Sequence, residues 1–89
     1  MDTEALTILR KEIDLLDGAL LDLLQKRAYL SKQVAKAKQG GTIFYPLREK
    51  EIVAKLQELN LSASGEEKKQ VLPSESIRHI WTEIFSCSR

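Results

Sequence analysis

The chain has 89 residues, of which 43% are hydrophobic and 30% charged, and its formal net charge is +1. These values indicate one small folded helical domain, and they exclude a disordered chain and a strongly basic nucleic-acid-binding protein. The single cysteine, Cys87, excludes an internal disulfide, and the sequence has neither a signal-peptide core nor an apolar run of transmembrane length. We therefore expect a cytoplasmic protein without a membrane or nucleic-acid partner.

Residues 3–38 predict one continuous amphipathic helix. The segment has no proline and one glycine, and its apolar residues recur at steps of three and four, which is the helical period. This apolar seam consists of Leu6, Leu9, Ile13, Leu16, Leu20, Leu23, Leu30, Val34 and Ala37. Arg27 stands where the seam requires an apolar residue, so the pattern directs a cation at the core.

The length of this helix predicts a homodimer. At 1.5 Å per residue it would be roughly 50 Å long, whereas a compact domain of this size has a radius of gyration of about 12 Å. The rest of the chain is too short to cover the seam, and a monomer would leave it in water. We expect an all-α fold in which the long helices of two copies are intertwined.

Two shorter helices follow in the predicted domain, which spans residues 1–89. Gly40 and Gly41 end the long helix, and Pro46 begins a second one over about residues 46–59. Residues 60–72 are small and polar, which favours a loop. Pro73 begins a third helix over about residues 73–89.

The third helix has an apolar face that ends on a hydroxyl. The face is formed by Ile77, Ile80, Trp81, Ile84 and Phe85, and one further turn places Ser88 inward, or leaves it on a frayed end. His79 has no cysteine or second histidine near it in the sequence, so we expect no metal site.

Four cations and one carboxylate are the candidate site residues: Arg10, Arg27, Lys38, Arg48 and Glu49. Arg27 and Lys38 lie about three turns apart on nearly the same side of the helix, so both side chains can reach one small anion. Arg10 lies about 25 Å from Arg27 along the axis, too far to share that ligand within one chain. An antiparallel partner helix would bring its own Arg10 to the site.

Each candidate also has a structural explanation. Arg10, Lys38 and Arg48 fit a solvated surface, and Glu49 in a first helical turn is favoured by the helix dipole. Arg27 on the seam is costly unless it binds an anion or forms a buried ion pair, for which Asp17 or Glu12 of a partner chain would serve.

These residues lie in a pattern that resembles the all-helical chorismate mutases. The pattern is carried by LRKEIDLLDGALLDLLQKRAYLSKQVAKAK, followed by a short loop and PLRE, and the resemblance covers about residues 9–88. The final segment, IFSCSR, resembles the end of the mutase domain in bifunctional chorismate mutase–prephenate dehydratases, in which a dehydratase follows.

The resemblance implies one active site for Arg27, Lys38, Arg48, Glu49 and Ser88, with Arg10 supplied by the partner chain. In this family the arginines hold the two carboxylates of chorismate, the lysine reaches the ether oxygen, and the glutamate contacts the ring hydroxyl. The sequence departs from the family at Tyr45, where a polar residue, often aspartate, is common. The glutamine that the family has one turn beyond Ser88 would fall after Arg89.

The resulting hypothesis is a dimeric chorismate mutase, an isomerase of aromatic amino-acid biosynthesis that forms prephenate without a cofactor or metal. An intramolecular rearrangement needs no nucleophile or base, which agrees with a sequence that lacks both a triad and a metal cluster. Two alternatives stay open: an isochorismate-pyruvate lyase of the same fold, and a non-catalytic helical dimerisation or regulatory module.

Overall fold

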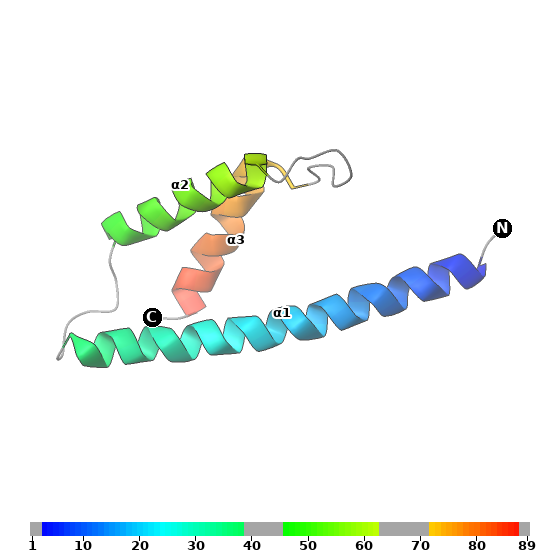
Figure 1. Ribbon diagram of the computed structural model, residues 1–89, viewed down its shortest axis with the longest axis horizontal. Coiled ribbons are helices and arrows are strands. Elements are labelled where there is room, and N and C mark those ends of the chain that lie inside the picture. The colour runs from blue at the N-terminus through cyan, green and yellow to red at the C-terminus, as the bar shows by residue number, and fades with distance from the viewer. Residues whose placement is uncertain (1–2, 39–45, 63–71, 88–89) are drawn as a thin grey trace.

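The computed structural model describes residues 3–38, 46–62 and 72–87 of the chain. These residues form three helices, α1 (Thr3–Ala37), α2 (Pro46–Ser62) and α3 (Ser74–Cys87), so the prediction of an all-α fold with one long N-terminal helix is confirmed. Helices α2 and α3 lie on the same side of α1, and the N-terminal half of α1 extends past both (Figure 1). None of the helices in these ranges combines the length and apolarity required to cross a membrane.

Helix α1 ends close to its predicted boundary. Glu4 in its first turn and Lys36 in its last turn complement the helix dipole. The backbone N–H of Lys38 donates to the carbonyl oxygen of Val34 over 3.1 Å, which completes the last turn.

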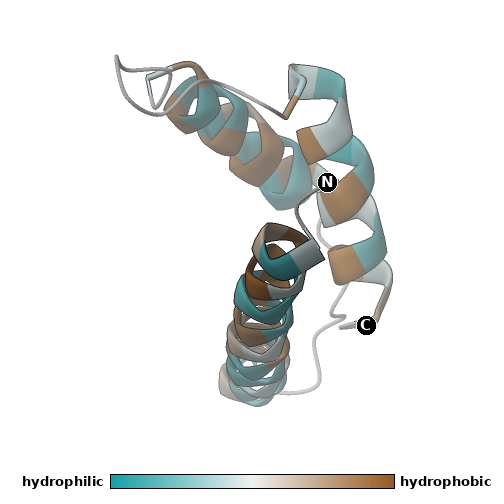
Figure 2. Ribbon diagram, turned by 90° about the vertical axis from the view of Figure 1, so that its right-hand side faces the viewer, coloured by the Kyte–Doolittle hydropathy of each residue, from teal (hydrophilic) through white to brown (hydrophobic). Residues whose placement is uncertain are grey.

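The apolar seam of α1 is exposed in the single chain. No residue of α1 is buried, and Leu16 keeps 64% of its surface in contact with solvent. Figure 2 shows hydrophobic residues along α1, which lies below both shorter helices in that view. The radius of gyration is 16.7 Å, against about 12 Å for a compact domain of this length. The chain therefore has too little mass beside α1 to cover it.

Helices α2 and α3 pack against each other and form the small core of the chain. Ile77 and Phe85 of α3 are the buried residues within the described ranges, each with 6% of its surface exposed. Helix α2 contributes the half-buried Ile52, Val53 and Leu56. Two side-chain amides of α2 hold the entry to α3, because Gln57 Nε2 donates to the Ser74 carbonyl over 2.9 Å and Asn60 Nδ2 to the Leu72 carbonyl over 2.9 Å.

Besides the end of α1, which falls one residue before the predicted end, two helix boundaries differ from the sequence prediction. Helix α2 continues to Ser62, three residues beyond the predicted end, so the loop expected from residue 60 was wrong for residues 60–62. These residues remain helical while the Asn60 side chain binds the Leu72 carbonyl. Helix α3 begins at Ser74 instead of Pro73, whose carbonyl accepts the N–H of Ser76 over 3.0 Å. The predicted end of α3, residues 88–89, lies outside the described ranges.

Candidate active site

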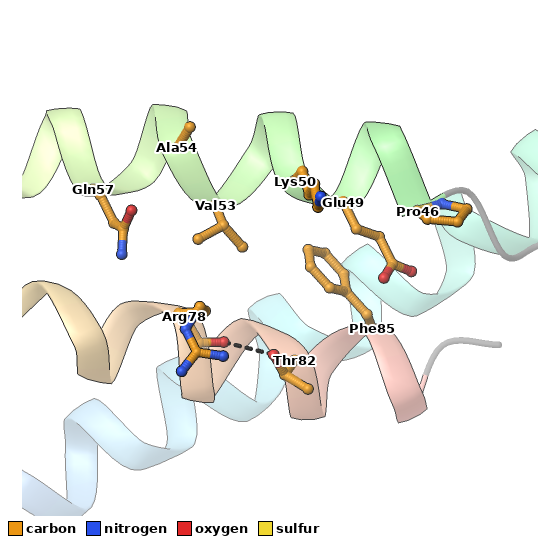
Figure 3. Close-up of a pocket in the computed structure, with 9 residues that line it drawn as sticks. All are labelled: Pro46, Glu49, Lys50, Val53, Ala54, Gln57, Arg78, Thr82 and Phe85. Atoms are coloured by element: carbon orange, nitrogen blue, oxygen red, sulfur yellow. Dashed lines mark hydrogen bonds between the residues drawn. The ribbon is translucent and has the colours of Figure 1, made fainter.

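A groove runs between α2 and α3 and has a volume of about 360 Å³. Figure 3 shows α2 and α3 on its two sides, with side chains from each directed toward the other. The lining residues are Pro46, Glu49, Lys50, Val53, Ala54, Gln57, Arg78, Thr82 and Phe85. Its walls therefore combine apolar surface with a small number of charged groups, as is common in sites for small ligands.

Glu49 is the predicted site residue that lines this groove. It lies in the first turn of α2, where its carboxylate is stabilised by the helix N-terminus, and it is half-buried. Figure 3 shows its side chain extending from α2 toward α3 beside the ring of Phe85. The placement agrees with a ligand contact and also with the simple dipole interaction.

From α1, Arg27 contacts Phe85, one of the residues that line the groove. Its Cζ atom lies 5.3 Å from the centroid of the Phe85 ring, and the residue is half-buried. Within the ranges that the structure describes, the three ion pairs do not include Arg27. The predicted seam cation therefore lies against an aromatic ring, and this ring of Phe85 also lines the groove beside Glu49.

The other predicted cations lie apart from the groove in the single chain. Lys38 and Arg48 are exposed, at the end of α1 and the start of α2, and neither lines the groove. Arg10 is exposed near the N-terminal end of α1, on the half of the helix that extends past α2 and α3. The predictions for Tyr45 and Ser88 fall outside the described residues.

The groove also contains polar residues that the sequence analysis missed. Arg78, Thr82 and Phe85 are spaced by four and three residues, so they lie on one face of α3. This spacing could have identified Arg78 and Thr82 as neighbours of Phe85 from the sequence. Arg78 Nε donates to Glu75 Oε2 over 2.8 Å. This hydrogen bond and the charge of Arg78 lower the pKa of Glu75, with a smaller contribution from His79, whose Nε2 lies 3.8 Å away.

The described residues offer no metal site, because no group of three or more His, Cys, Asp and Glu side chains converges among them. The groove is lined by one carboxylate, Glu49, by two cations, Lys50 and Arg78, and by apolar side chains. Such a set suits an anionic organic molecule that carries a hydroxyl group.

The sequence profile of the family described as "Chorismate mutase type II" matches residues 9–89. The chain is 42% identical over 85 residues to a "Bifunctional chorismate mutase/prephenate dehydratase" of Aquifex aeolicus, which covers 93% of this chain and 22% of that protein. It is 31% identical over 77 residues to a protein of the same description from Neisseria gonorrhoeae, covering 86% of this chain and 19% of that one.

A shorter relative is the "Intracellular chorismate mutase" of Mycobacterium tuberculosis, 42% identical over 53 residues, which are 57% of this chain and 50% of that protein. The chain thus spans about a fifth of the two bifunctional relatives. No solved structure matches the chain.

Proposed function

Because the chain belongs to the chorismate mutase type II family, we propose that it is an isomerase that converts chorismate to prephenate. The observation that carries the proposal, beyond the family, is that Phe85 of α3 contacts Arg27 of α1 and lines a groove together with Glu49 of α2. Arg27 can bind one of the two carboxylates of this substrate, and Glu49 can accept a hydrogen bond from its ring hydroxyl.

The proposed reaction is an intramolecular rearrangement in which one C–O bond breaks as one C–C bond forms. It requires the substrate to be held in a compact conformer, and bidentate arginines can fix carboxylates in this way. Arg27 and Arg48 are the proposed clamps from one chain. Glu49 is proposed to accept a hydrogen bond from the ring hydroxyl, and Ser88 and Tyr45 are further proposed contacts.

Lys38 is the proposed catalytic cation. Negative charge develops on the ether oxygen as the C–O bond breaks, and an ammonium group positioned there stabilises the transition state more than the bound substrate. Lys38 lies at the C-terminal end of α1, about three turns beyond Arg27 and on nearly the same side of the helix, so both long side chains can reach one small ligand between them.

We further propose that the active unit is a homodimer. The accessible surface of the chain is 7662 Å², against roughly 5300 Å² for a compact monomeric protein of this mass. The accessible surface of the chain thus exceeds that of a compact monomer. The excess from two such chains is as large as the surface that obligate homodimers bury in their interface. The seam of α1 is the apolar surface that such an interface would cover, and an antiparallel partner would bring its Arg10 to the site.

The relatives support two wider proposals about the intact protein. The two bifunctional relatives support a prephenate dehydratase domain joined to this one, and sequencing the gene past the codon for Arg89 tests this. The relative named as an intracellular enzyme supports a cytoplasmic location, which fractionation of cells that produce the protein would test.

The direct experiment for the function is to incubate the protein with chorismate and follow the loss of chorismate absorbance. Acid treatment of the product should give phenylpyruvate, which identifies prephenate. Arg27→Leu, tested in parallel, should remove the activity and so exclude a contaminating enzyme. Unchanged chorismate after incubation with the folded, dimeric protein would contradict the proposal and favour a non-catalytic module.

A further inference from the structure

Arg27 occupies a position where a cation requires a compensating group. It interrupts the apolar seam of α1 and is half-buried, and a charge withdrawn from water is costly unless something stabilises it. Among the described residues no acidic side chain pairs with it. The compensation within the chain comes from the ring of Phe85, 5.3 Å from the guanidinium carbon to the ring centroid.

This distance is within the range in which a cation is attracted to the face of an aromatic ring. Phe85 is one of the two buried residues of the described chain, with 6% of its surface exposed. The ring is therefore fixed by its packing, and it forms a rigid support for a long side chain that would otherwise sample many rotamers.

An aromatic ring and a carboxylate differ in whether the N–H groups and the charge of Arg27 stay available to a ligand. An acidic partner would neutralise Arg27 and occupy the N–H groups that bind a carboxylate in parallel pairs. An aromatic face attracts the guanidinium without cancelling its charge. Arg27 thus stays charged, oriented and able to accept an anionic ligand.

The same ring also lines the groove that contains Glu49. One buried side chain of α3 thereby contacts a cation from α1 and borders a carboxylate from α2. A shift of this ring would change the distance between the two groups that the proposed function assigns to opposite parts of the substrate.

We propose that Phe85 is a positioning residue that holds the Arg27 guanidinium, through its ring face, in the orientation that binds a substrate carboxylate. The inference rests on the proposed mutase function and deepens it. Phe85 acts through Arg27, so its electronic character should matter as well as its size.

The test replaces Phe85 with phenylalanine analogues that carry one, two or three fluorine atoms, and measures KM and kcat with chorismate. Fluorine withdraws electron density from the ring face and changes the shape little, so KM should rise with each fluorine while the melting temperature stays nearly constant. Phe85→Leu should raise KM about 3- to 10-fold, the equivalent of one cation–π contact. Phe85→Tyr should restore a KM close to that of the unmodified protein.

Trp81→Leu is the matched control, because it removes another aromatic ring from α3, one turn before Phe85 and half-buried. Its KM should change less than twofold. A KM increase equal to that of Phe85→Leu would overturn the inference, since loosening α3 would then explain both variants.

A second readout does not depend on turnover. Protons at Nε and Cδ of Arg27 should resonate upfield in the unmodified protein because of the Phe85 ring current, and Phe85→Leu should return them downfield. Absence of this shift would overturn the contact itself. If the protein converts chorismate but KM is unchanged across the fluorinated series, the role of Phe85 alone is overturned. If the unmodified protein does not convert chorismate, the proposed function and this inference are overturned together.

Discussion

Arg10 and Arg27 lie on one uninterrupted helix, α1, and are separated by about 25 Å along its axis. Arg27 lies against Phe85, which lines the α2–α3 groove, while Arg10 is on the half of α1 that extends past both shorter helices. A ligand the size of a single ring with two carboxylates cannot bridge this distance. The two arginines act on the same ligand only if they come from different chains.

The first prediction is that the protein is an obligate dimer. The exposed seam of α1 should be covered by the same seam of a second copy, because hydrophobic surface of this length is unstable in water. Sedimentation equilibrium at micromolar concentration should give about twice the chain mass of 10.1 kDa. A folded and stable species at the monomer mass would exclude both the dimer and the shared site.

The second prediction concerns Arg27→Leu. This variant should keep or raise the melting temperature, because leucine continues the apolar seam and removes a half-buried charge, at the cost of one cation–π contact of about 1 kcal/mol. Turnover and substrate binding should be lost. Thermal unfolding followed by circular dichroism, together with a chorismate assay, measures both.

Lys26→Leu is the control for this substitution. Lys26 is exposed and forms a surface ion pair with Asp22 over 3.6 Å, which contributes little. Activity should therefore remain. Marked unfolding of Arg27→Leu, with Lys26→Leu still stable, would instead indicate that Arg27 belongs to a structural ion pair with Asp17 or Glu12 of a partner chain.

The third prediction concerns the amide of Gln57, which holds the Ser74 carbonyl at the entry to α3. Gln57→Ala should lower the free energy of unfolding by about 0.5–1.5 kcal/mol, the usual net value of such a hydrogen bond. Gln25→Ala, on the exposed surface of α1, is the control and should change the free energy of unfolding by less than about 0.5 kcal/mol. Equal effects in the two variants would show that the bond to Ser74 adds no stability.

The fourth prediction is a pH effect from Glu75. The hydrogen bond and charge of Arg78 lower the pKa of Glu75 in the folded chain, so its stabilising contribution is complete above the pKa of the unfolded chain and is lost as the pH falls through the lowered value. Glu75→Gln should therefore lose less stability than the original chain between neutral pH and about pH 3. Urea denaturation at both pH values measures this, and identical losses would contradict it. The effect should be small, because the pair is exposed.

The helices could be predicted because the sequence signals for them are local. The seam of α1 and the prolines at positions 46 and 73 locate three helices, with a difference of at most three residues at each boundary that the described ranges test. The end of α2 was missed because Asn60 binds the Leu72 carbonyl, twelve residues away, and a polar residue near a helix end favours a loop on local grounds.

The site could be predicted only in part, because contacts between helices leave no local signal in the sequence. The periodicity of α1 identified Arg27 as an inward cation, but its contact with Phe85 depends on how α3 crosses α1. Likewise, Lys50 and Arg78 line the groove through the packing of α2 on α3. Residues from two helices that share a groove are not marked by any spacing within one segment.

The central claim is that each active site is built from two chains, and complementation between two inactive variants tests it most directly. Arg10→Ala removes a carboxylate clamp, and Lys38→Ala removes the cation at the breaking bond, so each alone should be nearly inactive. In a heterodimer of the two, one site carries both defects and the other carries neither.

Equal amounts of the two variants are unfolded together, refolded, and assayed with chorismate. Random pairing makes about half of the dimers heterodimers with one intact site each, so the mixture should recover about a quarter of the activity of the same mass of unmodified protein. Each variant refolded alone is the control, and mass spectrometry under native conditions verifies that heterodimers have formed. No gain over the separate variants, with heterodimers present, would show that Arg10 does not act across the interface.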